Sequence, residues 1–252
     1  MGRDPVDAQR KFYASRPHEH LQPRPDDAYS ARLVARLAFE LGISSEARVL
    51  EVGAGFGRFT FDLLDHCASV VALDLSQEAL ARLETARDER ALPSQRCRPL
   101  RVDLQGLDPA DLDGPFDFVV GFFILHHLPD YPDAIARLAR ALTPGGAMGF
   151  VEPNRRNPLF AAQVAFCPDM TWAEEKGMFQ LSSRGVRRAF DAAAMTPRPT
   201  RRFGFFPPAI INRLPMARRA ESGIERMRVF EPLLPFLLLS ARAGGGGPDI
   251  DE

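Results

Sequence analysis

Short apolar runs alternate with segments of helical periodicity from residue 47 onward, and each run ends beside a glycine or an acidic residue. Strands that alternate with helices in this order form a parallel sheet with helices on both faces. The chain has 252 residues, which is enough for one large domain or two small ones. The strands predicted from the apolar runs are residues 48–52, 70–74, 99–102, 116–121 and 147–151.

Helices are expected between these strands and on either side of them. An N-terminal helix is capped by Asp26, Asp27 or Ser30 and ends at Gly42, because its apolar residues share one helical face. The remaining helices are predicted at residues 59–67, 76–86, 131–142 and 183–194, and two more strands at residues 200–206 and 235–241.

The composition is that of an ordinary globular protein, with 45% apolar residues, 26% charged residues and a net charge of -1. Disordered, collagen-like and coiled-coil classes are therefore excluded. The longest strongly apolar run, residues 233–239, is far shorter than the roughly 20 residues of a membrane-spanning helix. No secretory leader is recognisable, and three widely spaced cysteines indicate no disulfide framework, so we expect a cytoplasmic protein.

The positive charge is unevenly distributed along the chain. Residues 184–228 hold eleven arginines against three acidic side chains, a local charge of +8. A solvated surface explains such a segment, and so does docking of an anionic partner such as a carrier protein, a phospholipid surface or a phosphorylated substrate. Nucleic acid is not expected, because aromatic and basic residues do not alternate as in a strand-binding groove.

The strongest local motif is VLEVGAGFGRFT at residues 49–60, in which an apolar strand runs into a glycine-rich turn and then a helix. Glycine permits a sharp turn and the close approach of a ligand. The glycines alternate strictly, unlike the G-x-G-x-x-G of dinucleotide sites, and Glu51 lies at the end of the strand. A carboxylate there repels a diphosphate, so the loop suits a ligand with an ammonium or sulfonium group.

Acidic residues follow the next two predicted strands. Asp74 comes 21 residues after Gly53, where a carboxylate accepts hydrogen bonds from both hydroxyls of a ribose. Capping of the next helix is the alternative role, but Ser76 already serves it. Asp103 follows the third strand, in reach of an adenine amino group. These residues together predict a nucleoside site.

With these motifs the chain resembles the class I S-adenosylmethionine-dependent methyltransferases, because E-x-G-x-G-x-G, Asp74, Asp103, the strand FDFVV and the turn LTPGG occur in the family's order. The resemblance implies a Rossmann-like α/β fold with a seven-stranded, mostly parallel sheet of order 3-2-1-4-5-7-6. It also implies S-adenosylmethionine as the cofactor. The cofactor-binding residues that it implies are Glu51, Gly53, Ala54, Gly55, Gly57, Asp74, Leu75, Asp103, Leu104, Gly121 and Phe122.

Methyl transfer from a sulfonium is an in-line displacement, so the enzyme needs a base only when the acceptor is a hydroxyl or an acidic carbon. His126 and His127 follow the fourth strand, and we prefer His127 as that base; a supporting role in the cofactor site is the alternative. The chain lacks an N/D-P-P-Y/F/W tetrad after this strand, which favours a small-molecule acceptor over DNA bases or protein glutamine. No metal is required.

We expect one methyltransferase domain over residues 31–243, preceded by an arm or lid over residues 1–30. Acceptor-side insertions are placed at residues 153–182 and 207–230, and a disordered tail at residues 244–252. Their large apolar side chains predict a lipophilic or aromatic metabolite as the acceptor. We favour O- or C-methylation of this acceptor, and a carrier-bound or anionic acceptor is an alternative. The candidate acceptor-binding residues are Tyr13, Asn154, Phe160, Trp172 and Phe205.

Two other functions remain open at this point. A methyltransferase-like protein that binds the cofactor without turnover, as a sensor or scaffold, would keep the same glycine loop and Asp74. A nicotinamide-dependent oxidoreductase shares the strand-turn-helix unit, although Glu51 and the glycine spacing disfavour it. Peripheral contact with a membrane is compatible with each of these functions.

Overall fold

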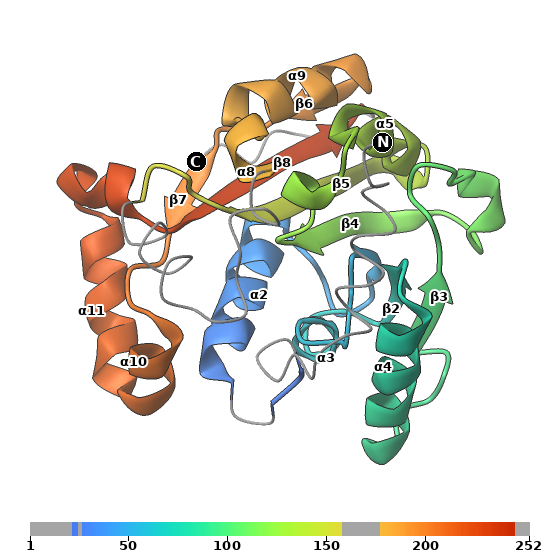
Figure 1. Cartoon of the computed structure of the whole chain (residues 1–252), viewed down its shortest axis with the longest axis horizontal. Coiled ribbons are helices and arrows are strands. Elements are labelled where there is room, and N and C mark those ends of the chain that lie inside the picture. Colours follow the sequence, from blue (N-terminus) through green and yellow to red (C-terminus); the bar gives the residue numbers. More distant parts are fainter. Residues whose placement is uncertain (1–21, 25–26, 158–176, 245–252) are drawn as a thin grey trace, which may run out of the picture.

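The computed structural model describes residues 22–24, 27–157 and 177–244, and a twisted sheet with helices on both faces forms its centre (Figure 1). The strand order is β3-β2-β1-β4-β5-β8-β6, and β7 also pairs with β8. The strands are β1 (Arg48–Val52), β2 (Ser69–Asp74), β3 (Cys97–Arg101), β4 (Phe116–Phe122), β5 (Leu142–Pro153), β6 (Met195–Pro197), β7 (Arg201–Phe203) and β8 (Phe236–Ala243).

This architecture confirms the predicted fold. The first five strands are parallel, and β8 inserts antiparallel between β5 and β6. The predicted strand at residues 200–206 differs in detail, because two short strands, β6 and β7, pair with different parts of β8. Pro197 and Pro199 lie at this break, where a residue without a backbone N–H cannot continue a ladder of hydrogen bonds.

Helices cover both faces of the sheet. On one face lie α2 (Ala28–Leu41), α3 (Thr60–Leu63) and α4 (Gln77–Glu89); on the other lie α5 (Tyr131–Ala139), α8 (Gly177–Gln180) and α9 (Ser183–Ala192) (Figure 1). Asp27 caps α2 at its start and Gly42 ends it, as expected from the sequence. The predicted helix at residues 59–67 is only the four-residue α3, because the chain must reverse into β2 at Ser69.

The predicted insertion at residues 207–230 is helical. It forms α10 (Pro208–Arg213), α11 (Pro215–Glu225) and the 3₁₀ helix η4 (Arg228–Leu233), which lie beside α2 at the side of the sheet (Figure 1). Pro208 and Pro215 occupy first helical positions, where proline's missing N–H costs nothing. Two further 3₁₀ helices are η2 (Pro109–Asp111) and η3 (Leu125–His127).

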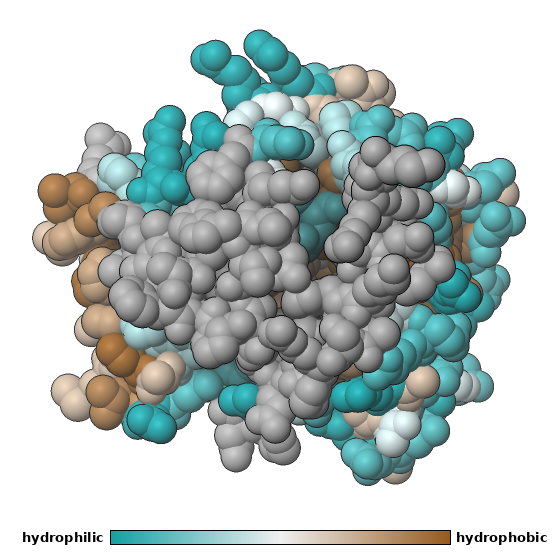
Figure 2. Space-filling view, viewed as in Figure 1, coloured by the Kyte–Doolittle hydropathy of each residue, from teal (hydrophilic) through white to brown (hydrophobic). Residues whose placement is uncertain are grey.

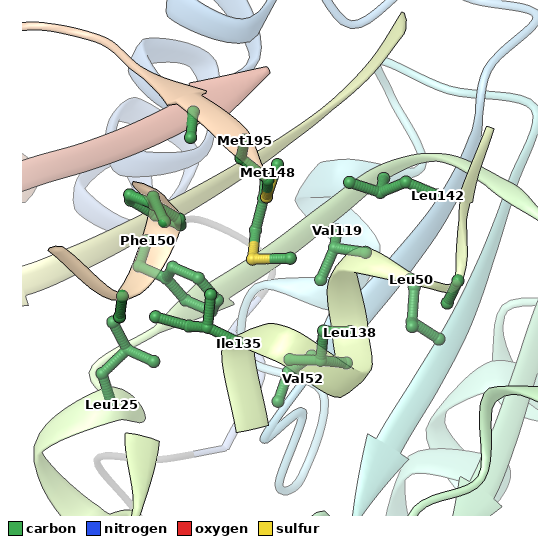
Figure 3. Close-up of a cluster of buried hydrophobic side chains, with 14 of the residues drawn as sticks. Leu50, Val52, Val119, Leu125, Ile135, Leu138, Leu142, Met148, Phe150 and Met195 are labelled. Carbon is green, nitrogen blue, oxygen red and sulfur yellow. The ribbon is translucent and has the colours of Figure 1, made fainter. Parts of the chain in front are cut away.

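Each face of the sheet has its own hydrophobic core. The core under α5 and α9 contains Leu50, Val119, Ile135 and Phe150, which are completely buried (Figure 3). The core under α2 includes Val34, Leu37 and Leu63. Because both faces of β1 and β4 are buried, these strands have little freedom to shift, and the loops at their carboxyl ends are held in place.

No helix within the described residues is long and apolar enough to cross a membrane. The predicted boundaries of the arm and of the tail fall mostly on residues 1–21 and 245–252, outside the described residues, and remain predictions. The same holds for most of the predicted insertion at residues 153–182.

Candidate functional site

A crevice opens at the carboxyl ends of β1, β2 and β4. In the sheet, β2 lies on one side of β1 and β4 lies on the other, so the direction of the strand order reverses at β1. Such a reversal of strand order is the usual ligand site of an open α/β sheet. The crevice is lined by Gly53, Leu73, Asp74, Leu75, Ser76, Val102, Asp103, Leu104, Gln105, Ile124, His127, Leu128 and Pro129.

Asp74, the last residue of β2, organises one wall of the crevice. Its Oδ2 accepts a hydrogen bond from the backbone N–H of Gly55 at 2.8 Å, and its Oδ1 accepts one from the N–H of Ser76 at 2.8 Å. Burial raises the pKa of this carboxyl group, while the backbone donors act in the opposite direction. The carboxylate therefore fixes the glycine loop and still has lone pairs for a ligand. Ser76 caps α4, as predicted.

Gly53 is the glycine of the loop whose small size matters most directly. Its φ is +73°, and a Cβ atom there would lie 2.6 Å from Cδ1 of Ile124. Ile124 precedes η3 and lines the crevice. A larger residue at position 53 would displace Ile124 and, with it, the loop that carries the histidines.

Glu51 lies behind the crevice and does not line it. Its side chain is 1% exposed, and the hydroxyl of Thr60 donates a hydrogen bond to Oε2 at 2.6 Å. Burial raises the pKa of Glu51 to about 7, although the Thr60 bond lowers it. A buried carboxylate without a nearby cation is costly, so a positively charged ligand group close to Glu51 would favour its ionised form.

Glu51→Gln should change how stability depends on pH. The pKa of Glu51 rises from 4.5 toward 7 on folding, so the folded state holds a proton that the unfolded state loses. The free energy of unfolding of the wild-type protein therefore falls as pH rises through this window, by roughly 2 kcal/mol between pH 5 and pH 8. Urea unfolding at both pH values should show that the variant's stability relative to wild type is higher at pH 8 than at pH 5 by this amount. An equal difference at both pH values would contradict the assignment.

A second buried carboxylate, Glu152 near the end of β5, holds the loop after β4. Its Oε1 accepts hydrogen bonds from the backbone N–H groups of Ile124 and Leu125 at 3.0 and 2.8 Å. Its Oε2 lies 2.6 Å from Nδ1 of His126, and the side chains of both residues are almost inaccessible to solvent. His126 thus interacts with Glu152, a pair that was not predicted from the sequence.

His127 lies beside His126, with 4.0 Å between the ring centroids, and lines the crevice. Burial, together with a smaller contribution from the neighbouring His126, lowers the pKa of His127 to about 3. The imidazole is therefore neutral at physiological pH. It offers a hydrogen-bond acceptor in the crevice, but its basicity is weak.

The structure brings together five of the predicted cofactor residues: Gly53, Asp74, Leu75, Asp103 and Leu104 line the crevice. The others support it from behind. Ala54 and Gly53 donate backbone hydrogen bonds to the carbonyl of Leu73, while Gly57 bonds to Ala54. Gly121 lies on β4 against Ile124, and the buried ring of Phe122 stacks on Phe59 with centroids 4.3 Å apart.

The candidate acceptor residues are dispersed. Asn154 is 2% exposed, and its amide donates hydrogen bonds to the carbonyls of Pro232 and Leu234 at 3.1 and 2.8 Å. It therefore ties β5 to the segment before β8 and is not among the residues that line the crevice. Phe205 packs edge-on against Phe206 and Phe230 and does not line the crevice. Tyr13, Phe160 and Trp172 lie outside the described residues.

The chemistry of the lining residues fits a nucleoside with a positive charge. Leu75, Val102 and Leu104 offer apolar walls for a flat base, and Asp74 and Asp103 offer acceptors. Among the lining residues there is no arginine or lysine, so no cationic side chain there pairs with a diphosphate. Within the described part of the chain, no group of three or more His, Cys, Asp or Glu side chains could hold a metal ion. Seven lining residues were not predicted as site residues from the sequence, although Ser76 was expected as a helix cap: Leu73, Ser76, Val102, Gln105, Ile124, Leu128 and Pro129.

Comparison with known proteins points to the same region. A family described as "Methyltransferase domain" matches residues 50–148. A phosphatidylethanolamine N-methyltransferase of Cereibacter sphaeroides is 33% identical over 123 residues, 47% of this chain and 57% of that protein. A malonyl-[acyl-carrier protein] O-methyltransferase of Enterobacter lignolyticus is 33% identical over 133 residues, 53% of this chain and 46% of that protein. The chain thus spans about half the length of the curated relatives it matches.

The fold has relatives among solved structures. The N-methyltransferase NodS from Bradyrhizobium japonicum, in complex with S-adenosyl-L-homocysteine, superposes with a TM-score of 0.56 at 16% identity. The match covers 95% of this chain and 98% of NodS. At this identity the likeness establishes the fold alone.

Proposed function

This chain belongs to the class I S-adenosylmethionine-dependent methyltransferases, and we propose that it transfers a methyl group from S-adenosylmethionine to a small lipophilic or aromatic acceptor. The observation that carries the proposal is the crevice at the end of β2, where Asp74 is fixed by Gly55 and Ser76 beside apolar walls that lack a cationic side chain. A ribose and a base suit such a site, and the buried carboxyl group of Glu51 behind the glycine loop disfavours a diphosphate there.

The chain's own residues provide binding and orientation. Asp74 would accept hydrogen bonds from the ribose hydroxyls, Leu75 and Leu104 would enclose the base, and Asp103 would reach its amino group. Glu51 would favour the ammonium end from behind the glycine loop. When bound, S-adenosylmethionine supplies a methyl group on a sulfonium, ready for displacement by the acceptor. Alignment and exclusion of water then account for most of the rate enhancement.

Aromatic side chains beyond the end of β4 support a lipophilic or aromatic acceptor. The ring of Phe123 lies 5.9 Å from that of Phe59 and 5.5 Å from that of Phe236, and Tyr29 meets Phe236 at 6.0 Å. Phe123 directly precedes Ile124, so this cluster begins next to the crevice. We propose O- or C-methylation, with His127 as the group that accepts a hydrogen bond or a proton from the acceptor.

His127→Ala should lower kcat by about tenfold and leave the dissociation constant of S-adenosylmethionine unchanged. The effect is at the low end for a general base, because a pKa of about 3 makes His127 a weak one. The wild-type kcat should also show no inflection from His127 between pH 5 and pH 8. Steady-state kinetics across this range would test both statements. Wild-type turnover in the alanine variant would remove His127 from the reaction.

Calorimetry separates the proposal from its competitors. We expect the protein to bind S-adenosylmethionine and S-adenosylhomocysteine and to ignore NAD. Cofactor consumption measured against a panel of lipophilic and phenolic metabolites would then identify the acceptor class. Failure to bind either sulfur nucleoside would overturn the proposal, and binding without turnover on any acceptor would favour a sensor or scaffold.

A further inference from the structure

The outer side of α10, α11 and η4 combines exposed apolar and cationic side chains, and we call it the α10–α11 face. Six large hydrophobic residues are exposed in the described part of the chain, and all except Phe39 belong to this face. Its apolar members are Leu214, Met216, Met227, Val229 and Leu233, and its cationic members are Arg213, Arg219 and Arg226. Figure 2 shows brown, hydrophobic atoms gathered at this side of the molecule.

The two kinds of side chain share one stripe along α11. The stripe consists of exposed residues at intervals of three, four, three and one positions: Met216, Arg219 and Gly223 in α11, and Arg226 and Met227 directly after it. Residues three and four apart lie above one another on a helix. Met216 is 84% exposed, and Val229 on the following turn is 71% exposed, so these side chains project from the surface and do not pack on it.

The acidic residues of the same helix point the other way. Glu221 is 1% exposed; it accepts hydrogen bonds from the N–H groups of Phe205 and Phe206 and pairs with Arg32 at 2.7 Å. Glu225 accepts a hydrogen bond from the N–H of Gly204 and also pairs with Arg32. The fold thus uses the carboxylates of α11 internally and leaves Arg219 and Arg226 exposed, while the half-buried Arg218 donates a hydrogen bond to the carbonyl of Ile211.

We propose that the α10–α11 face docks the protein on an anionic phospholipid bilayer. A surface with arginines beside projecting apolar side chains matches the boundary of such a bilayer, where phosphates meet acyl chains. An acidic protein partner would match the arginines but would leave five exposed apolar side chains unexplained. The proposal concerns a surface separate from the crevice and does not depend on methyl transfer.

Vesicle co-sedimentation tests the arginines. The intact protein should bind vesicles composed of about two thirds phosphatidylcholine and one third phosphatidylglycerol, and it should dissociate from them at high salt. Replacement of Arg213, Arg219 and Arg226 by glutamine should weaken this binding by about 100-fold, because each arginine near an anionic surface contributes about fivefold. The matched control replaces Arg184, Arg187 and Arg188, which are exposed on α9, and should bind as wild type does.

A second variant tests the apolar contribution. Met216→Ser with Val229→Ser keeps the charge and changes only projecting side chains, so folding should be unaffected; vesicle binding should fall by about tenfold. Absence of binding to the anionic vesicles would overturn the proposal, as would an equal loss in the α9 control. Concentration-dependent dimerisation that the serine variant abolishes, without vesicle binding, would assign the face to a second copy of the chain. Salt-sensitive binding to an acidic carrier protein but not to vesicles would assign it to that partner.

Discussion

Asp74→Ala should reduce the affinity for S-adenosylmethionine by at least about 100-fold while the protein remains folded. Alanine removes the acceptor for the ribose and also the bonds from Gly55 and Ser76 that hold the glycine loop. Hydrogen bonds to a charged group contribute about 1.5–3 kcal/mol each, so the loss of two or more accounts for this factor. Stability should change little, because the buried carboxylate is itself costly and its pKa is raised by burial.

Isothermal titration with S-adenosylhomocysteine and urea unfolding would measure the two effects separately. Asp108→Ala is a matched control, because Asp108 also accepts a backbone hydrogen bond, from Ala110, but does not line the crevice. It should lose about 1 kcal/mol of stability and keep full affinity. Asp74→Ala binding as tightly as wild type would show that the nucleoside lies elsewhere.

Much of the fold was predictable because its signals are local. The first strand, its glycine turn and the cap of α4 at Ser76 each need only a few neighbouring residues. Asp74 was predictable for the same reason, since it ends a strand whose neighbours in a parallel sheet follow from the sequence. The order of the strands came from the resemblance, whereas the alternation of strands and helices predicted only a parallel sheet with helices on both faces.

Contacts between distant segments were beyond the sequence. Glu152 and His126 are 26 positions apart and meet only because β5 lies next to β4 in the sheet. The sequence also did not show which charged side chains of residues 184–228 are exposed and which are buried, because composition gives only the net charge of this segment. No helix was predicted in the insertion that contains Pro215, although a proline at the first position of a helix, as in α11, favours that helix.

Glu152→Ala should destabilise the protein by about 3–5 kcal/mol and weaken cofactor binding in whatever remains folded. The substitution removes the acceptor for the N–H groups of Ile124 and Leu125 and leaves the buried His126 without its carboxylate. Removing the acceptor of these three buried hydrogen bonds has about this cost. The loop that carries Ile124 and His127 into the crevice then loses its anchor.

Glu152→Gln keeps the fold accessible to measurement. Its carbonyl oxygen can still accept from Ile124 and Leu125, but its amide group cannot accept from His126, so we expect a loss of about 1–2 kcal/mol and a weaker affinity for S-adenosylhomocysteine. Glu221→Gln is the matched control: it perturbs an equally buried carboxylate with two backbone donors, far from the lining residues in sequence. Both variants should lose stability, but only Glu152→Gln should lose affinity. If Glu152→Gln and wild type bind S-adenosylhomocysteine with equal affinity, Glu152 stabilises the end of β5 without positioning the crevice loop.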